Sequence, residues 1–145
     1  MKIGFVANDV LTEKPVYTTT RLAMHAANLG HEAWLIGMGN FSYEPDGSLS
    51  ARARGGNGKH YRSLERYLED VQRPEVDERL ILSDFDVVML RSDPAEDAQG
   101  AAWANNAGVA FGQLIASTGV LVVNDPGSLA NALSKAYFQH FPEVV

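Results

Sequence analysis

The sequence has no cysteine, and acidic residues outnumber basic ones. Without cysteine, the chain can form neither a disulfide bond nor a thiolate metal site. Twelve Lys and Arg against 18 Asp and Glu give a formal net charge of −6 at pH 7. This balance argues against nucleic acid or an anionic membrane surface as the main partner. It does not exclude a small anionic ligand, because a few local side chains determine whether such a ligand binds.

Long apolar runs are also missing. No stretch approaches the roughly 20 apolar residues that a membrane-spanning helix needs. The apolar start at residues 3–6 is too short for the hydrophobic region of a signal peptide, and no cleavage pattern follows it. We therefore expect a cytoplasmic protein. Its 145 residues, 46% hydrophobic and 21% charged, suit a single globular domain over 1–145.

Short apolar runs alternate with helical patterns along the chain. Strands without a polar face are typical of parallel sheets that are covered on both sides. The alternation predicts an α/β fold, with a parallel sheet of at least four strands and helices on both faces. The strands are expected at residues 2–7, 32–37, 87–90 and 120–123, and the helices at 21–29, 61–71, 103–118 and 128–136.

A small β-ribbon is expected between the second strand and the second helix. Residues 41–43 and 49–53 flank Pro45-Asp46-Gly47, a turn signature, and we place this ribbon outside the main sheet. The glycine-rich, basic segment 52–60 lacks the GK[ST] of a phosphate-binding loop, so a surface loop is expected there. Residues 72–79 are expected to form a polar connector.

A charged run follows the most apolar of the predicted strands. Arg91, Asp93 and Asp97 come within a few residues of the strand at 87–90. Ligands of parallel α/β sheets bind beyond the carboxyl ends of the strands, so this run is a candidate site. The alternative is a solvated loop in which Asp93 or Asp97 only caps the next helix.

Two further strands end in polar pairs. Asn8 and Asp9 follow the first strand, and Asn124 and Asp125 follow the strand at 120–123. With Arg91, they would converge on one edge of a parallel sheet. Arg91 would bind a carboxylate in a bidentate manner, and the acids would hold an ammonium group. The expected ligand is therefore an amino acid or a small peptide.

The start of the first helix is a third candidate. Thr18, Thr19 and Thr20 precede the helical run, and Gly30 follows it, as is typical of helix ends. A helix start beside a strand end can also receive an anion, because its free N–H groups point outward. Thr19 is therefore a candidate substrate-binding residue, with helix capping alone as the alternative.

The sequence shows no motif for metal binding, for nucleophilic catalysis or for nucleotide binding by a Rossmann domain. The four histidines are scattered without metal-ligand spacing, and no nucleophile elbow is present. A metal site at Asp93 and Asp97 would need more converging oxygen ligands than the sequence shows. No GxGxxG follows the first strand, which disfavours a nucleotide-binding Rossmann domain acting alone.

Five segments of the chain form a recognisable series: KIGFVAND, TTTRLAMHAANLGHE, ARAR, DFDVVMLRSDPAED and TGVLVVNDPGSLANALSKAYFQHFPE. In this order and spacing they resemble the N-terminal, pre-ATP-grasp domain of bacterial glutathione synthetase and related ATP-grasp ligases. Members usually carry Arg-Lys-Asp-Pro-Pro-Phe-Asp, whereas this chain has Ser92, Ala95 and Glu96 in place of the lysine, the second proline and the phenylalanine.

The resemblance implies a Rossmann-like domain that helps to bind the peptide substrate and contributes to contacts in a homo-oligomer. In the family reaction, ATP phosphorylates a carboxylate and an amine attacks the acyl phosphate, as when γ-Glu-Cys is joined to glycine. ATP and Mg²⁺ are bound chiefly by two lobes that follow this domain. Lys135 matches a family lysine that approaches the nucleotide phosphates.

The sequence given stops at Val145, where the ATP-grasp lobes would begin. We therefore expect no ligase activity and no bound cofactor for these 145 residues alone, and Phe138 and Phe141 would pack on the lobes or on a second copy. Two alternatives stay open. The chain could be a stand-alone binding or dimerisation module, or part of another ATP-grasp ligase, such as a peptide- or glutamate-adding enzyme.

Overall fold

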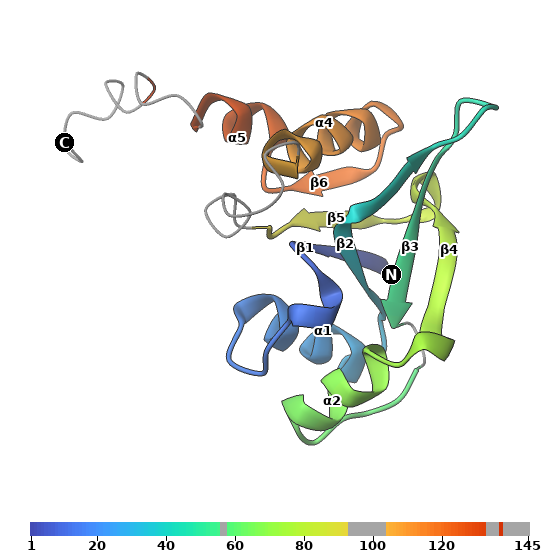
Figure 1. The fold of residues 1–145 in the computed structure, drawn as a ribbon, viewed down its shortest axis with the longest axis vertical. Coiled ribbons are helices and arrows are strands. Elements are labelled where there is room, and N and C mark those ends of the chain that lie inside the picture. The colour runs from blue at the N-terminus through green and yellow to red at the C-terminus, as the bar shows by residue number, and fades with distance from the viewer. Residues whose placement is uncertain (56–57, 93–103, 133–136, 138–145) are drawn as a thin grey trace.

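The computed structural model describes residues 1–55, 58–92, 104–132 and 137 (Figure 1). The fold is α/β, and one six-stranded mixed sheet has the order β4-β3-β2-β1-β5-β6. The strands are β1 (Lys2–Ala7), β2 (Glu32–Tyr43), β3 (Leu49–Gly55), β4 (Asp77–Ile81), β5 (Val87–Leu90) and β6 (Leu121–Val123). The helices are α1 (Thr18–Asn28), α2 (Leu64–Val71), α4 (Ala104–Ser117) and α5 (Pro126–Ala132), with 3₁₀ turns η1 (Val10–Thr12), η2 (Pro74–Val76) and η3 (Leu82–Asp84).

The four strands predicted from apolar runs form the parallel part of the sheet. β1 pairs in parallel with both β2 and β5, and β5 pairs in parallel with β6. β1 is therefore central, and its residues from Ile3 to Ala7 are all buried. The prediction of a parallel sheet of at least four strands is confirmed.

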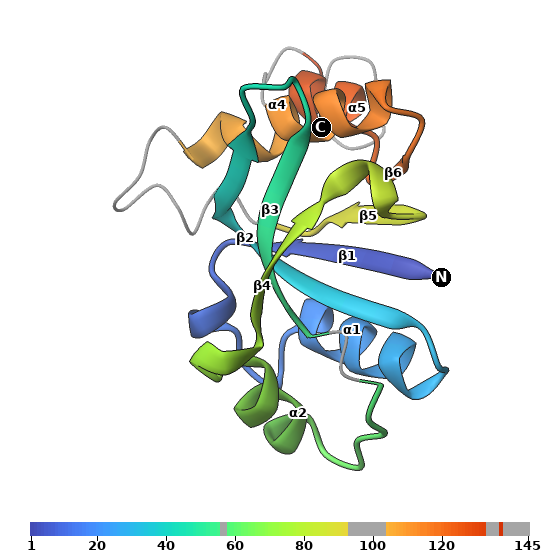
Figure 2. The same cartoon turned by 90° about the vertical axis from the view of Figure 1, so that its right-hand side faces the viewer.

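Helices cover both faces of this sheet (Figures 1 and 2). Successive side chains of a strand point to opposite faces, so each strand feeds two cores. Ile3 and Phe5 pack with α1 and α2, whereas Val6 packs with the α4 side of the sheet. Among the helices of the described part, none is long and apolar enough to cross a membrane.

The ribbon lies inside the main sheet, so its predicted place outside the sheet is wrong. β2 continues through Met38-Gly39-Asn40 to Tyr43, with a register irregularity between Ile36 and Phe41. β3 pairs antiparallel with β2 on both sides of this irregularity, at residues 34–36 and 41–43, and β4 adds to β3 as an antiparallel edge. The predicted turn at Pro45-Asp46-Gly47 is confirmed, with Gly47 at a φ of 85°.

Two further local predictions are corrected in the same region. Residues 52–55 belong to strand β3 rather than to a surface loop, and the expected connector at 72–79 contains the start of β4. This basic segment can form a strand because the charge of the half-buried Arg54 is satisfied by partners in neighbouring segments. Its guanidinium pairs with Asp77 and donates hydrogen bonds to the carbonyl oxygens of Gln72 and Arg73.

Helix α1 ends as predicted but begins differently. Gly30 has a φ of 85°, the left-handed conformation that glycine adopts at helix ends. The N-cap is Tyr17, whose side chain makes no capping hydrogen bond, and Thr18 already belongs to the helix. The predicted threonine N-cap is therefore wrong, because the threonines occupy the first turn instead.

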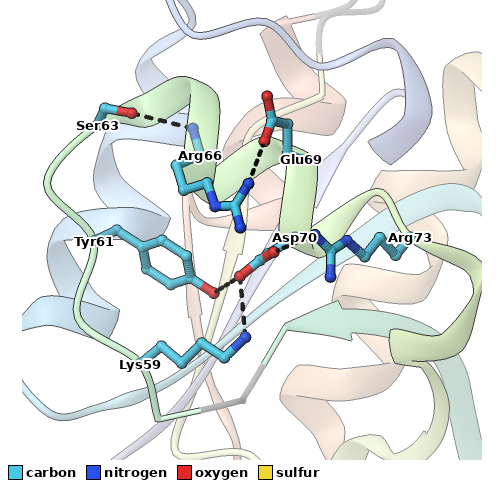
Figure 3. Close-up of polar contacts among 7 residues, drawn as sticks. All are labelled: Lys59, Tyr61, Ser63, Arg66, Glu69, Asp70 and Arg73. Atoms are coloured by element: carbon cyan, nitrogen blue, oxygen red, sulfur yellow. Dashed lines mark hydrogen bonds and ion pairs between the residues drawn. The ribbon is translucent and has the colours of Figure 1, made fainter.

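A buried carboxylate fixes the C-terminal turn of α2 (Figure 3). Asp70 accepts hydrogen bonds from Lys59 Nζ at 3.2 Å and Tyr61 Oη at 3.1 Å, and it pairs with Arg73 at 3.1 Å. Burial alone would raise the pKa of Asp70, but these hydrogen bonds and the charges of Lys59 and Arg73 lower it below its ordinary value of 3.8. The contacts tie residues 59–61, which precede α2, to the helix end.

Asp70→Asn is expected to lower the unfolding free energy at pH 7 by about 1–2 kcal/mol. The effect is moderate because Lys59 and Arg73 are 59% and 51% exposed, and water screens their charges. The folded pKa lies below the unfolded one, so this stabilisation is complete above about pH 4 and is lost as the pH falls through the folded pKa. Urea denaturation of both proteins at pH 7 and pH 2.5 should give a smaller difference at the lower pH, and a constant difference would contradict this account.

Candidate functional site

A pocket of about 330 Å³ opens at the carboxyl ends of β1 and β5. Its walls come from three segments that are far apart in sequence: the end of β1, the segment from η1 to the start of α1, and the residue after β5. Polar groups dominate these walls, which suits a charged or hydrogen-bonding ligand. The described lining residues are Asn8, Glu13, Val16, Tyr17, Thr18, Thr19 and Arg91.

The pairing of β1 with β5 places Asn8 and Arg91 at the same edge. Val6 lies opposite Leu90 in the parallel register, and the Arg91 amide donates to the carbonyl oxygen of Val6 at 2.9 Å. The Arg91 side chain is exposed. Arg91 lines the pocket, and within the described ranges its guanidinium is in no ion pair. A guanidinium carries a planar fork of N–H donors that suits an anion.

The start of α1 forms a second wall. Thr18 and Thr19 lie in the first helical turn, where backbone N–H groups have no partner within the helix. The positive end of the helix dipole favours a negative group at this place. Glu13 is also at this turn, because its Oε2 accepts a hydrogen bond from Thr20 Oγ1 at 2.8 Å. The pocket therefore combines a cationic side chain, a helix start and one carboxylate.

The structure brings three of the predicted site residues together and places two others apart. Asn8, Thr19 and Arg91 line the pocket. Asp9 caps η1, because its Oδ1 accepts from the Leu11 amide at 2.9 Å. Asn124 donates from Nδ2 to the carbonyl oxygen of Leu90 at 2.8 Å, so its amide joins the ends of β6 and β5. The predicted residues Asp93, Asp97 and Lys135 lie outside the described residues.

Asp125 serves the next helix. Its Oδ1 accepts the Ser128 backbone N–H at 2.7 Å, and this bond, followed by the Ser128 hydroxyl and the Gly127 N–H, lowers the pKa of Asp125. The sequence left open whether Asp125 or Ser128 caps this helix, and the structure assigns the cap to Asp125.

Sequence reasoning singled out Thr18 only as part of the helix start, and it missed Glu13, Val16 and Tyr17 as lining residues. They belong to a segment without periodicity, in which nothing distinguishes a pocket wall from a surface loop. Only the place of the segment in the chain could have indicated its role. It connects the end of a central strand to the helix start already named as a candidate.

A cation site would need several oxygen or nitrogen ligands that converge on one point. The described residues bring together no group of three or more His, Cys, Asp or Glu side chains that could hold a metal ion. The polar lining of the pocket instead suits an organic ligand that carries charged groups.

The parallel core, the helices on both faces and the polar pocket beyond β1 and β5 define a Rossmann-like α/β domain. The family model described as the prokaryotic glutathione synthetase N-terminal domain matches residues 1–130. The chain belongs to this family, as its sequence motifs predicted. A search of curated proteins gives no match.

Proposed function

We propose that this domain binds the amino-acid or peptide substrate of an ATP-dependent ligase of the glutathione synthetase type. The observation that carries the proposal is the convergence of Arg91 with the start of α1 in one pocket, in a chain of this family. The proposed reaction joins γ-Glu-Cys to glycine with ATP. Lys135 is proposed to approach the nucleotide.

The pocket supports a ligand that carries charges of both signs. Arg91 offers bidentate hydrogen bonds to a carboxylate, and the N–H groups at the start of α1 favour the same negative charge. The carboxylate of Glu13 and the amide of Asn8 offer acceptors for an ammonium group or a peptide N–H. γ-Glu-Cys has two carboxylates, one ammonium group and one peptide bond, so it matches this set of groups.

The proposed part of these residues in the ligation is binding and orientation. ATP would activate a carboxylate as an acyl phosphate, and an amine would then displace the phosphate. Arg91, Asn8 and Thr19 would hold the peptide so that its reacting end points out of the pocket. Holding a substrate in one geometry removes much of the entropic barrier to reaction.

Calorimetric titration of the protein with γ-Glu-Cys and its close analogues tests the proposal. We expect γ-Glu-Cys to bind, and we expect conversion of one of its carboxylates to an amide to weaken binding by roughly tenfold to a hundredfold, since hydrogen bonds between charged groups contribute about 1.5–3 kcal/mol. Removal of the amino group should weaken binding by a smaller factor. Equal affinity for all three analogues, or no heat with any of them, would contradict the proposal.

The same titrations separate the alternatives. Stronger binding of a different peptide, such as a glutamate-extended one, would indicate another ligase on the same scaffold. The homo-oligomer and the cytoplasmic location implied by the family stay predictions. Sedimentation of the protein over a range of concentrations would test the first of them.

A further inference from the structure

One side chain from a distant helix holds the pocket segment that contains Glu13. Gln72, at the C-terminal cap of α2, donates from its amide Nε2 to three backbone carbonyl groups of one short segment. The acceptors are the carbonyl oxygens of Val10 at 2.9 Å, Glu13 at 3.2 Å and Leu11 at 3.4 Å. Each contact links residues about sixty positions apart in sequence.

Gln72 is itself fixed by its backbone. Its amide N–H donates to the carbonyl oxygen of Leu68 at 2.9 Å, which closes the last turn of α2. Its carbonyl oxygen accepts from Arg54 Nη1 at 3.1 Å, and Arg54 comes from strand β3. The guanidinium of Arg54 also pairs with Asp77 of β4. Through its backbone carbonyl and its side chain, Gln72 therefore connects the antiparallel half of the sheet to the wall of the pocket.

The remaining hydrogen bonds described for this segment are mostly local. Asp9 caps only the first turn of η1, and the Tyr17 amide donates to the carbonyl oxygen of Lys14 within the segment itself. Val10 is buried, but Leu11 and Val16 are exposed, so apolar packing holds the segment mainly at its beginning. Gln72 contacts the backbone carbonyl oxygen of Glu13, and Thr20 contacts its carboxylate.

We propose that Gln72 is a positioning residue that sets the ligand affinity of the pocket by holding residues 10–13. The identity of the ligand in this inference rests on the proposed function, whereas the contact between Gln72 and residues 10–13 does not. Three carbonyl oxygens converge on one nitrogen, so the group at position 72 must be a donor. A carboxylate of the same shape would face three acceptors, whereas an ammonium group would donate to them.

The experiment compares Gln72→Glu with Gln72→Lys. Asp70→Asn is the matched control, because it weakens the same helix end without touching residues 10–13. The first readout is hydrogen exchange of the Leu11, Thr12 and Tyr17 amides without ligand, and the second is the affinity for γ-Glu-Cys. We expect Gln72→Glu to speed exchange and to weaken binding, each by about five- to tenfold. Gln72→Lys should stay within about twofold of the unmodified protein, and so should the control.

The two readouts separate failure of this inference from failure of the proposed function. Unchanged exchange in Gln72→Glu would overturn the inference, and so would faster exchange with unchanged peptide affinity. Equal losses in the Glu and Lys variants would also overturn it, because the donor would then be irrelevant. If the unmodified protein does not bind γ-Glu-Cys, the proposed function fails, and the exchange data alone decide whether Gln72 holds the segment.

Discussion

Replacement of Gly55 by alanine is expected to lower the unfolding free energy by roughly 2–5 kcal/mol, the sum of backbone strain and steric overlap. Gly55 ends β3 with a φ of 131°, a conformation that residues with a Cβ rarely adopt. A Cβ there would collide with the carbonyl oxygen of Ala33 and lie 3.5 Å from the Cα of Trp34. Both are backbone atoms of β2, which is held between β1 and β3 and cannot move aside.

Gly30→Ala is the matched control for this prediction. Gly30 also has a positive φ, 85°, but nothing lies within 4 Å of a Cβ built on it. We expect a loss of about 1 kcal/mol, from backbone conformation alone. Urea denaturation, monitored by circular dichroism, gives the unfolding free energy of both variants. An equal decrease of the unfolding free energy in Gly55→Ala and Gly30→Ala would show that the contact between Gly55 and β2 is not as close as described.

Arg91→Ala is expected to weaken binding of γ-Glu-Cys by roughly tenfold to a hundredfold, because a bidentate, charge-assisted contact contributes about 1.5–3 kcal/mol. Any affinity for ATP should change much less. Arg91→Lys should recover only part of the loss, since an ammonium group keeps the charge but not the planar fork of donors. Calorimetric titration of each variant gives the affinities.

Arg66→Ala is the control for the Arg91 variants. Arg66 is an exposed arginine on α2 that pairs with Glu69 at 2.9 Å and does not line the pocket. Its replacement changes the net charge by the same amount and should leave the peptide affinity unchanged. A similar loss in both variants would mean that overall charge, and not a contact at Arg91, governs binding. Equal weakening of peptide and ATP would count against Arg91 as a carboxylate ligand.

The parallel core was predictable because a strand buried on both faces has a continuous run of apolar residues. The four apolar runs became β1, the first half of β2, β5 and β6. The antiparallel half was less visible. The second strand was predicted to end at residue 37, but β2 continues through Met38, Gly39 and Asn40 with a register irregularity. Arg52 and Arg54 read as a loop, because the sequence does not show the carboxylate of Asp77 that pairs with both.

The site was predictable only in outline. Position after a parallel strand identified Asn8 and Arg91, which the structure places in one pocket. The same rule also selected Asp9 and Asn124, whose side chains instead bond to backbone groups. Aspartate and asparagine are favoured both at caps and in ligand sites, so residue type could not separate the two uses. Gln72 had no local signal, because its acceptors lie some sixty residues away.

The most direct test of the central claim is an NMR titration of the protein with γ-Glu-Cys. The claim is that the ligand binds where the ends of β1 and β5 meet the start of α1. We expect the largest shift changes at the amides of Asn8, Thr18, Thr19 and Arg91, with little change along β4 and α2. Changes centred on β4 and α2, or no changes at saturating peptide, would contradict the claim.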